Sequence, residues 1–301
     1  MKSGLKPDAK AAALLYFLIA VMVLLWSANF IIGKIALRQF PPLILGGLRV
    51  TFAGLFILPL YLRQSWREGT AGHWADAPLL LLLGVMGVAL NQFLFVLGLS
   101  QTTVAHSAII IGLTPIFVLL IAAAMKQERI TARRAAGMAV ALAGVAILNS
   151  ATQTGADGRS TATGDIFIIF AAITFAWFTV VGKGVTHRQN SITVNTFAYV
   201  GAAIAFAPVI FWQSRSFDFR EVTTMGWITV AYMALFPSVI CYLIYYWALT
   251  KIPASKLSAF TYFQPLLTTL MGMAVLGEHM TAHLIAGGTV IFGGVYLTER
   301  S

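Results

Sequence analysis

Uncharged polar side chains are the groups in this sequence best suited to bind a small molecule. They stand within long apolar stretches, where burying such a group without a hydrogen-bond partner costs about 1–3 kcal/mol. We therefore expect them to face one another, main-chain groups or a water-filled cavity. Amides and hydroxyls offer donors and acceptors without a fixed charge, which suits a zwitterion. The residues concerned are Asn29, Asn91, Gln92, Thr114 and Gln264.

Aromatic side chains form a second set, concentrated in the second half of the chain. Tyr242, Tyr245 and Tyr246 have the spacing i, i+3, i+4 and share one face of a helix. Together with rings on other stretches they predict an aromatic-lined cavity. An aromatic belt at the membrane interface is the alternative, and it claims some of these rings. The rings proposed for the cavity are Trp26, Phe95, Trp177, Tyr242, Tyr245, Tyr246 and Tyr262.

No Asp or Glu falls in the middle of an apolar stretch. Proton-coupled pumps usually need a buried ionisable group, so the sequence disfavours a carboxylate-based antiporter and favours downhill export or exchange. His106, near the start of an apolar stretch, could relay protons or bind a carboxylate. A hydrogen bond at the membrane interface is the alternative for this histidine.

A polytopic membrane enzyme is a competing class of function. It needs His, Asp, Glu or Cys side chains clustered at membrane depth. The acids lie outside the apolar stretches, and Cys241 is the single cysteine, which excludes an internal disulfide and a multi-cysteine metal site. We therefore expect no catalytic residue, no cofactor and no metal.

The composition shows which elements must hold these side chains. The chain has 301 residues, of which 59% are hydrophobic and 10% charged, and its mean hydropathy is +0.84. A soluble domain carries about 25% charged residues, so this is a polytopic membrane protein. Spans of roughly 20 residues are expected. The predicted spans are 11–32, 42–62, 77–98, 104–125, 132–150, 164–182, 193–213, 225–248, 256–277 and 281–298.

An internal repeat relates the two halves of the chain. Pro115 precedes Glu128 by 13 residues, Pro265 precedes Glu278 by 13, and a Thr-Ala pair follows each acid. The offset of 150 residues also aligns Gly144 with Gly294, whereas the earlier spans align at an offset of 149. Each unit holds five spans, an odd number, so the second copy enters the membrane upside down. Inverted repeats are typical of alternating-access transporters.

The longest polar connection, whose composition is that of a linker, falls midway along the chain. We therefore predict a first five-helix repeat over 1–150, a periplasmic linker over 151–163 and a second repeat over 164–301. Lys and Arg are far more numerous on the side of the two chain ends, which predicts that both ends are cytoplasmic in a bacterial-type inner membrane. The net charge of +10 is assigned to this orientation and not to nucleic acid.

The prolines and the acids that recur in the two halves each allow two interpretations. Pro115 and Pro265 each remove a main-chain donor, which makes them either hinges or packing kinks. For Glu128 and Glu278 we favour a structural role, as caps of the next helix through the adjacent threonines or as partners of Arg133 or His283. A role in energy coupling is the alternative.

Several motifs resemble the EamA-type family of the drug/metabolite transporter superfamily. They are WSANFIIGK at 26–34, PPLILGGLR at 41–49, the two proline–glutamate segments, and LAGVAIL and FGGVYL near the ends of the halves. The resemblance covers nearly the whole chain and implies ten helices in a 5+5 inverted fold. Helices 1, 3, 4, 6, 8 and 9 would surround a central cavity, and helices 5 and 10 would buttress it outside. The family pattern carries an arginine at Arg49, which we expect to pair helix 2 with a neighbour.

The expected function is that of an alternating-access exporter of small zwitterionic metabolites, chiefly amino acids and aromatic ones among them. Within this family, the sequence resembles the subgroup of YddG-type aromatic amino acid exporters. Exporters or carriers of nucleosides, sugars or quaternary amines are the alternative, and a structural protein has no evident use for such a repeat. The expected partners are the small-molecule substrate and membrane lipid, for a monomer or weak dimer.

Overall fold

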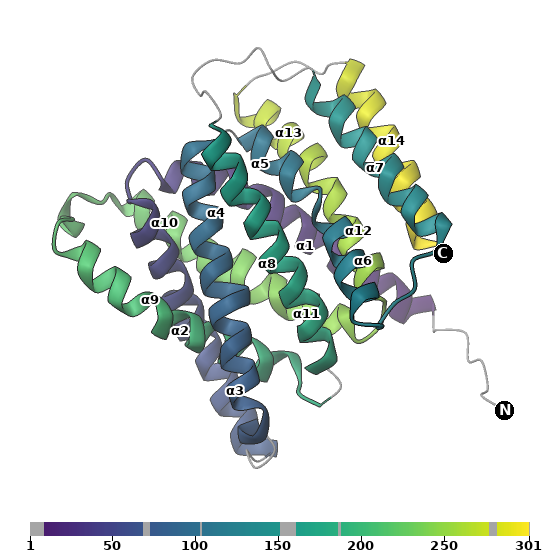
Figure 1. The fold of residues 1–301 in the computed structure, drawn as a ribbon. Coiled ribbons are helices and arrows are strands. Elements are labelled where there is room, and N and C mark those ends of the chain that lie inside the picture. Colours follow the sequence, from purple (N-terminus) through teal and green to yellow (C-terminus); the bar gives the residue numbers. More distant parts are fainter. Residues whose placement is uncertain are drawn as a thin grey trace.

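The protein is a bundle of helices in a computed structural model (Figure 1) that describes residues 9–68, 73–102, 104–150, 161–185, 188–276 and 282–300. These residues form helices and their connections, without strands. The elements are α1 (Ala9–Ala36), α2 (Pro42–Glu68), α3 (His73–Leu83), η1 (Gly84–Ala89), α4 (Leu90–Gln101), α5 (Val104–Ile111), α6 (Thr114–Ala124), α7 (Ala132–Ser150), α8 (Ala162–Val185), α9 (Ser191–Ser214), η3 (Phe219–Glu221), α10 (Thr224–Met233), η4 (Ala234–Ile240), α11 (Cys241–Leu249), α12 (Ala254–Ala259), η5 (Phe260–Tyr262), α13 (Phe263–Leu276) and α14 (Ala282–Glu299).

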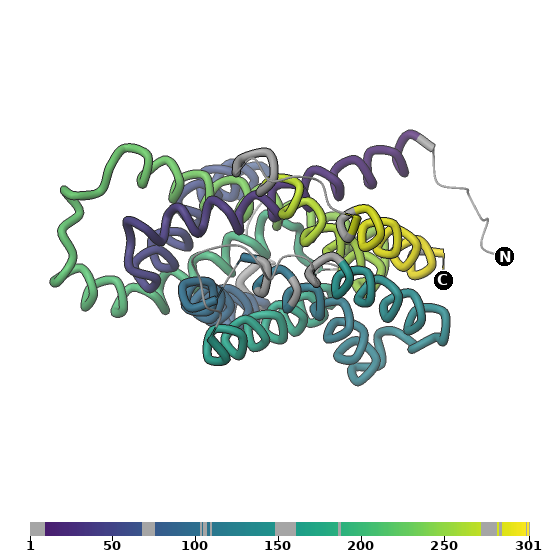
Figure 2. The backbone as a smooth tube through the Cα atoms, turned by 90° about the horizontal axis from the view of Figure 1, so that it is seen from above, coloured from purple at the N-terminus to yellow at the C-terminus, as the bar shows by residue number. Residues whose placement is uncertain are grey.

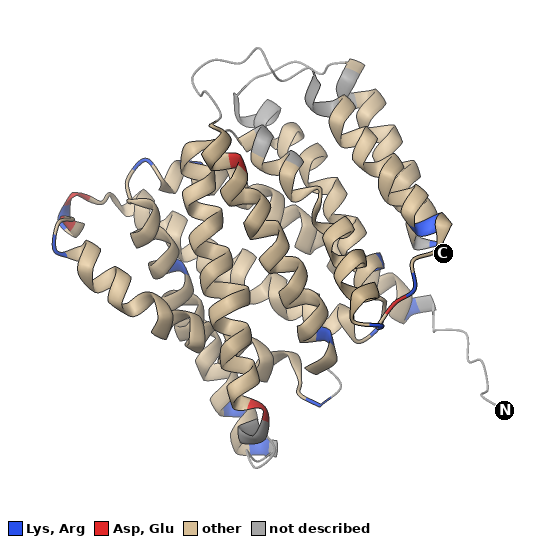
Figure 3. Ribbon diagram, in the orientation of Figure 1, with Lys and Arg blue, Asp and Glu red and all other residues tan. Residues whose placement is uncertain are grey.

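Each predicted span coincides, over its described residues, with one helix or with two α-helices in succession, and in three spans a π segment or a 3-10 turn lies between the two. Among the described residues, six helical stretches are long and apolar enough to cross a membrane, and α6 and α14 contribute shorter apolar helices. Charged residues gather toward the ends of the helices and in the connections (Figure 3). Helix α8 begins at Ala162, two residues before the predicted span 164–182. The predicted linker over 151–160 lies outside the described residues.

Two π-helical segments, η1 and η4, interrupt long helices. At the end of each segment a main-chain N–H donates to the carbonyl five residues back, Leu90 to Val85 and Cys241 to Phe236. In η4 the cause is visible, because Pro237 has no N–H for the carbonyl of Met233. The hydroxyl of Ser238 takes that role and donates to the Met233 oxygen over 2.8 Å. The segments begin 150 residues apart, at Gly84 and Ala234.

The two helices that carry the matched prolines are broken just before each proline, which corrects the prediction of continuous apolar helices. α5 ends at Ile111, and α6 starts at Thr114 with Pro115 in its first turn. The 3-10 turn η5 likewise separates α12 from α13, whose first turn contains Pro265. In a first turn the missing N–H of proline has no helical partner to lose, so these helices restart there without cost.

Helices α7 and α14 pack together at the side of the bundle (Figures 1 and 2). Small residues permit this close approach: a Cβ added at Gly144 would lie 2.7 Å from the N of Ile291, and one added at Gly137 would lie 2.7 Å from the N of Thr298. The small-residue faces of these helices are therefore used within one chain.

The main core lies among α1, α2, η1, α8, α9 and α11. Its largest fully buried side chains include Met22, Phe178, Tyr199, Tyr245 and Tyr246. A smaller core joins α6 and η5 to the α7–α14 pair. The main core therefore surrounds the middle of the bundle and fixes the helices whose side chains form the cavity described next.

Candidate functional site

A partly open cavity of about 80 Å³ lies in the middle of the bundle. It is bounded by side chains from α1, α2, α4, α5, α6, α8, α11, η5 and α13. Of the residues that the sequence singled out, Trp26, Asn29, Asn91, Gln92, Phe95, Thr114, Tyr242 and Gln264 stand in its wall. The others in the wall are Phe30, Arg49, Ile111, Phe175 and Thr261. None of the described wall residues comes from α7 or α14, and α2 contributes a residue from outside the expected set of helices.

Several wall residues occupy corresponding places in the two halves of the chain. Trp26 and Phe175 are 149 residues apart, and three further pairs are 150 residues apart: Gln92 and Tyr242, Ile111 and Thr261, Thr114 and Gln264. The helices of both halves thus turn corresponding faces to one cavity. The sequence could have revealed Phe175 through its offset from Trp26.

Contacts of its indole N–H and of its ring fix the orientation of the Trp26 side chain. The N–H donates to the carbonyl oxygen of Pro237 over 2.9 Å. That oxygen is free because the π geometry of η4 sends the N–H of Cys241 to Phe236. The ring meets Phe175 and Tyr242 edge-on, each at a centroid distance of 5.8 Å. Three aromatic rings from α1, α8 and α11 therefore form one rigid part of the wall.

Arg49 is 3% exposed and joins α2 to the second half of the chain. Its Nε donates to the hydroxyl oxygen of Ser238 over 2.9 Å, so it does connect helix 2 to a neighbour. The hydroxyl of Tyr199 donates to the main-chain oxygen of Ser238 over 3.0 Å and braces the same residue. The Nη1 atom of Arg49 has no hydrogen-bond partner.

The amide and hydroxyl groups of the wall are only partly satisfied. The Nδ2 of Asn91 donates to the Ala171 oxygen of α8 over 2.7 Å, and the Nε2 of Gln92 lies 3.4 Å from Asn91 Oδ1. The oxygens of three buried side chains, Asn29, Gln92 and Thr114, have no partner. A buried acceptor without a donor is costly, so these oxygens are available to donor groups of a bound molecule.

Four predicted wall residues lie elsewhere. Tyr245 stands one layer behind, with its hydroxyl 3.0 Å from Thr179 Oγ1 and its ring against Trp26. Tyr246 packs edge-on against Phe178, and Trp177 packs on the outside of the main core. Tyr262 turns away from the cavity into the smaller core.

The physical reason for these differences is local. Tyr245 and Tyr246 share a helix face with Tyr242 but lie about one turn further along the helix axis. The cavity reaches only the turn that carries Tyr242. In η5 the 3-10 turn brings Thr261 and not Tyr262 to the wall. The side chain of His106 lies outside the described residues. Among the described residues, no three His, Cys, Asp or Glu side chains are placed to hold a metal ion.

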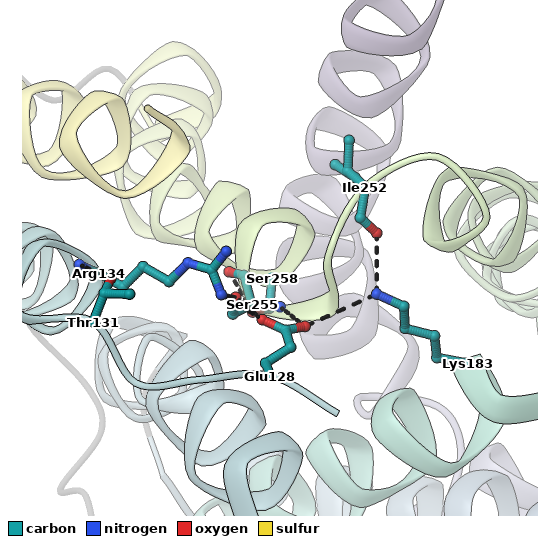
Figure 4. A network of polar contacts seen from close by, with 7 residues as sticks. All are labelled: Glu128, Thr131, Arg134, Lys183, Ile252, Ser255 and Ser258. Carbon is teal, nitrogen blue, oxygen red and sulfur yellow. Dashed lines mark hydrogen bonds and ion pairs between the residues drawn. The ribbon is translucent and has the colours of Figure 1, made fainter. Parts of the chain in front are cut away.

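Glu128 is the centre of a polar network beside the α6–α7 connection (Figure 4). Its Oε2 lies 2.9 Å from Arg134 Nη1 and accepts from the hydroxyl of Ser255, and its Oε1 accepts from the Ser255 main-chain N–H over 3.3 Å. Lys183, at the end of α8, approaches the same carboxylate at 3.9 Å. The acid therefore ties the first half to α8 and α12 of the second.

This network corrects one expectation for Glu128 and supports another. Arg134, and not Arg133, is the ion-pair partner. The helix cap comes from Thr131, whose hydroxyl accepts from the N–H of Arg134 over 3.2 Å. Glu278, the counterpart of Glu128, lies outside the described residues.

Two lysines make corresponding contacts at opposite ends of α8. Lys34 donates to the carbonyl of Thr102 over 2.7 Å, and Lys183 donates to that of Ile252 over 3.4 Å. The lysines are 149 residues apart and the carbonyls 150. Thr102 also donates to Asp165 at the start of α8 over 2.6 Å. Polar contacts between the halves thus occur at both ends of the bundle, with the cavity between them.

Comparison with known proteins gives one family and one fold. The model of the EamA-like transporter family matches residues 13–150 and again residues 162–300. The uncharacterized transporter YetK of Bacillus subtilis is 26% identical, and the match covers 94% of this chain and 86% of YetK. An uncharacterized transporter of Archaeoglobus fulgidus is also 26% identical, and that match covers 95% of this chain and 98% of the relative. The uncharacterized inner membrane transporter YedA of Escherichia coli K12 is 24% identical over 92% and 88%. A crystal structure with 19% identity matches at a TM-score of 0.76 over 96% of this chain and 97% of the other.

Proposed function

The chain belongs to the EamA-like transporter family, and we propose that it exports small zwitterionic metabolites, chiefly amino acids and aromatic ones among them, across the inner membrane. The observation that carries this proposal is the cavity, whose wall combines aromatic rings with unpaired amide and hydroxyl oxygens. Rings suit an apolar side chain, and the polar atoms suit the charged groups of a zwitterion.

We propose further that the two halves form a 5+5 inverted repeat, with residues 1–150 and 164–301 as its units. Three observations support this arrangement: the family model matches twice, the π segments recur after 150 residues, and the cavity wall contains corresponding pairs. Transport would then proceed by rocking of the halves about the cavity. In that motion the breaks before Pro115 and Pro265 act as hinges of opposing gates.

The orientation follows from the same repeat and from the excess of Lys and Arg on one side. We propose that both chain ends face the cytoplasm, so that the Glu128 network lies on the cytoplasmic side. The working unit in this proposal is the monomer, since its cavity is built from one chain. Membrane lipid and the transported molecule are its partners.

The test is flux in liposomes that contain the purified protein. Labelled phenylalanine and leucine are compared with glucose, uridine and tetraphenylphosphonium, and empty liposomes give the background. We expect amino acid flux well above background, lost in Trp26→Ala and retained in the matched variant Trp66→Ala, since Trp66 is 86% exposed. Flux of the comparison compounds without amino acid flux would refute the proposed substrate class.

A further inference from the structure

Arg49 is the one charged side chain in the described wall of the cavity. No acidic side chain of the described residues forms an ion pair with it. Among the described residues its hydrogen-bond partner is Ser238, whose neutral hydroxyl accepts from Nε and leaves Nη1 without a partner. A positive charge therefore stands beside the cavity without a counter-ion from the described residues.

A purely structural role does not account for this arrangement. Taking a guanidinium out of water costs several kcal/mol, which proteins normally offset with a buried acid or an anion. A neutral donor would join α2 to η4 without that cost. The side chain is also braced from behind, because Ser238 is itself fixed through Met233 and Tyr199. The guanidinium is therefore held in place through Nε, and its Nη1 atom remains available for a bound molecule.

We propose that Arg49 binds the carboxylate of the transported molecule. The inference rests on the proposed transport function and narrows its substrate class to small molecules that carry a carboxylate. Guanidinium is the side chain whose planar fork matches a carboxylate, and hydrogen bonds between these charged groups are about twice as strong as neutral ones. Quaternary amines are excluded as preferred substrates, because the nearest fixed charge repels them.

The charge of Arg49 also sets the orientation of the transported molecule in the cavity. The position that corresponds to Arg49 in the second half is Ala198, 149 residues later, which is fully buried against Gly84. The cation is therefore present on one side only. The unpaired oxygens of Asn29 and Gln92 accept from an ammonium group, and the ring of Trp26 borders the space for an apolar side chain.

The experiment uses probes that vary the carboxylate and the ammonium group separately. One set is L-phenylalanine, L-phenylalaninamide and 3-phenylpropionate, and the second is glucuronate with glucose. Each probe is measured by flux in liposomes and by its protection of the purified protein against thermal unfolding, which exposes the buried Cys241 to a thiol-reactive dye. The variants are Arg49→Gln, Arg49→Lys and the control Arg63→Gln, an exposed arginine on the same helix.

We expect the wild type and the Arg63→Gln protein to prefer L-phenylalanine over L-phenylalaninamide, and glucuronate over glucose, on the order of 10- to 100-fold. Binding of 3-phenylpropionate, which keeps the carboxylate, should depend on Arg49 in the same way. Arg49→Gln should abolish this preference, and Arg49→Lys should restore part of it. Arg49→Lys also serves as the test if the glutamine variant does not fold.

The outcomes separate the two proposals. Equal flux and binding of the probes with and without a carboxylate would overturn the role of Arg49 and leave the transport function standing. Binding of glucuronate that depends on Arg49, with no flux or binding of phenylalanine, would support the role of Arg49 and refute amino acid export. If no probe is moved or bound, both proposals are wrong.

Discussion

The indole N–H of Trp26 and the carbonyl oxygen of Pro237 are joined by a 2.9 Å hydrogen bond, although 211 residues separate them in sequence. The bond exists because a proline in η4 shifts the main-chain pairing to a π pattern and frees that oxygen. One local irregularity thus orients the central ring of the cavity. The same irregularity places Ser238 against Arg49.

The first prediction concerns this bond. Trp26→Phe keeps an aromatic ring but leaves the buried Pro237 oxygen without a donor. Such a loss costs about 1–3 kcal/mol, so the unfolding temperature should fall by several degrees. Reaction of the buried Cys241 with a thiol dye during heating reports the unfolding. The exposed Trp66→Phe should leave it unchanged, and equal shifts for both variants would argue against the role of the bond.

The second prediction concerns Ser238. Ser238→Ala removes the acceptor of Arg49 Nε and the donor to the Met233 oxygen, so both the guanidinium and η4 lose a support. A hydrogen bond to a charged group contributes about 1.5–3 kcal/mol, and we expect the affinity for L-phenylalanine to fall about tenfold or more. Flux in liposomes over a range of concentrations measures the change.

The control for Ser238 is a serine with the same kind of bond at the surface. The hydroxyl of Ser214 donates to the Phe211 oxygen over 3.0 Å in an exposed position. Ser214→Ala should alter flux and unfolding temperature little, because water replaces the hydroxyl. A Ser238→Ala protein with wild-type affinity would show that Arg49 needs no such support.

The third prediction uses two adjacent glycines in α14. A Cβ at Gly294 would lie 2.7 Å from the Cα of Ala141 in α7, whereas one at Gly293 meets nothing within 4 Å. Gly294→Ala should separate α7 from α14 and lower the unfolding temperature strongly, by overpacking that costs about 1–3 kcal/mol. Gly293→Ala should be neutral or stabilising, since alanine is the better helix former. Similar behaviour of the two variants would contradict the packing of this pair.

The positions of the helices could be predicted from the sequence because apolar length and flanking charge determine them locally. The π segment η1 could not, since it contains no proline and lies where Gly87 packs closely against Phe178 of α8. The polar half of the cavity wall was predictable as well. Asn91 and Gln264 are amides that an apolar helix must turn toward a partner or a cavity.

The aromatic half was predicted less well, for a geometric reason. Spacing shows that Tyr242, Tyr245 and Tyr246 share a face, but it does not show how far along the helix the cavity extends. Arg49 was expected to pair with a neighbouring helix. The carboxylate-binding role that we propose for it rests on the absence of a buried acid nearby among the described residues. Such an absence becomes visible only when the described helices are assembled.

The last prediction concerns Glu128, which links three elements beside the α6–α7 connection. If the halves rock apart at this end, the carboxylate must leave Ser255 and Lys183 of the second half. Glu128→Gln removes the charge that holds Arg134 and Lys183 together, and these two cations then repel each other. A change of about 1.4 kcal/mol shifts a two-state equilibrium tenfold, so we expect the open state at this end to become several-fold more populated.

Accessibility of the cavity measures that population. In a Cys241→Ser background, Thr261→Cys places a single thiol in the cavity wall, and a membrane-impermeant reagent is applied to vesicles of either orientation. Labelling from the side of Glu128 should rise several-fold in Glu128→Gln and stay unchanged in Asp218→Asn, an exposed acid in the α9–α10 connection. An unchanged rate in Glu128→Gln would mean that this network supports the fold without controlling access, whereas a rise from the opposite side alone would reverse the assignment of the gate.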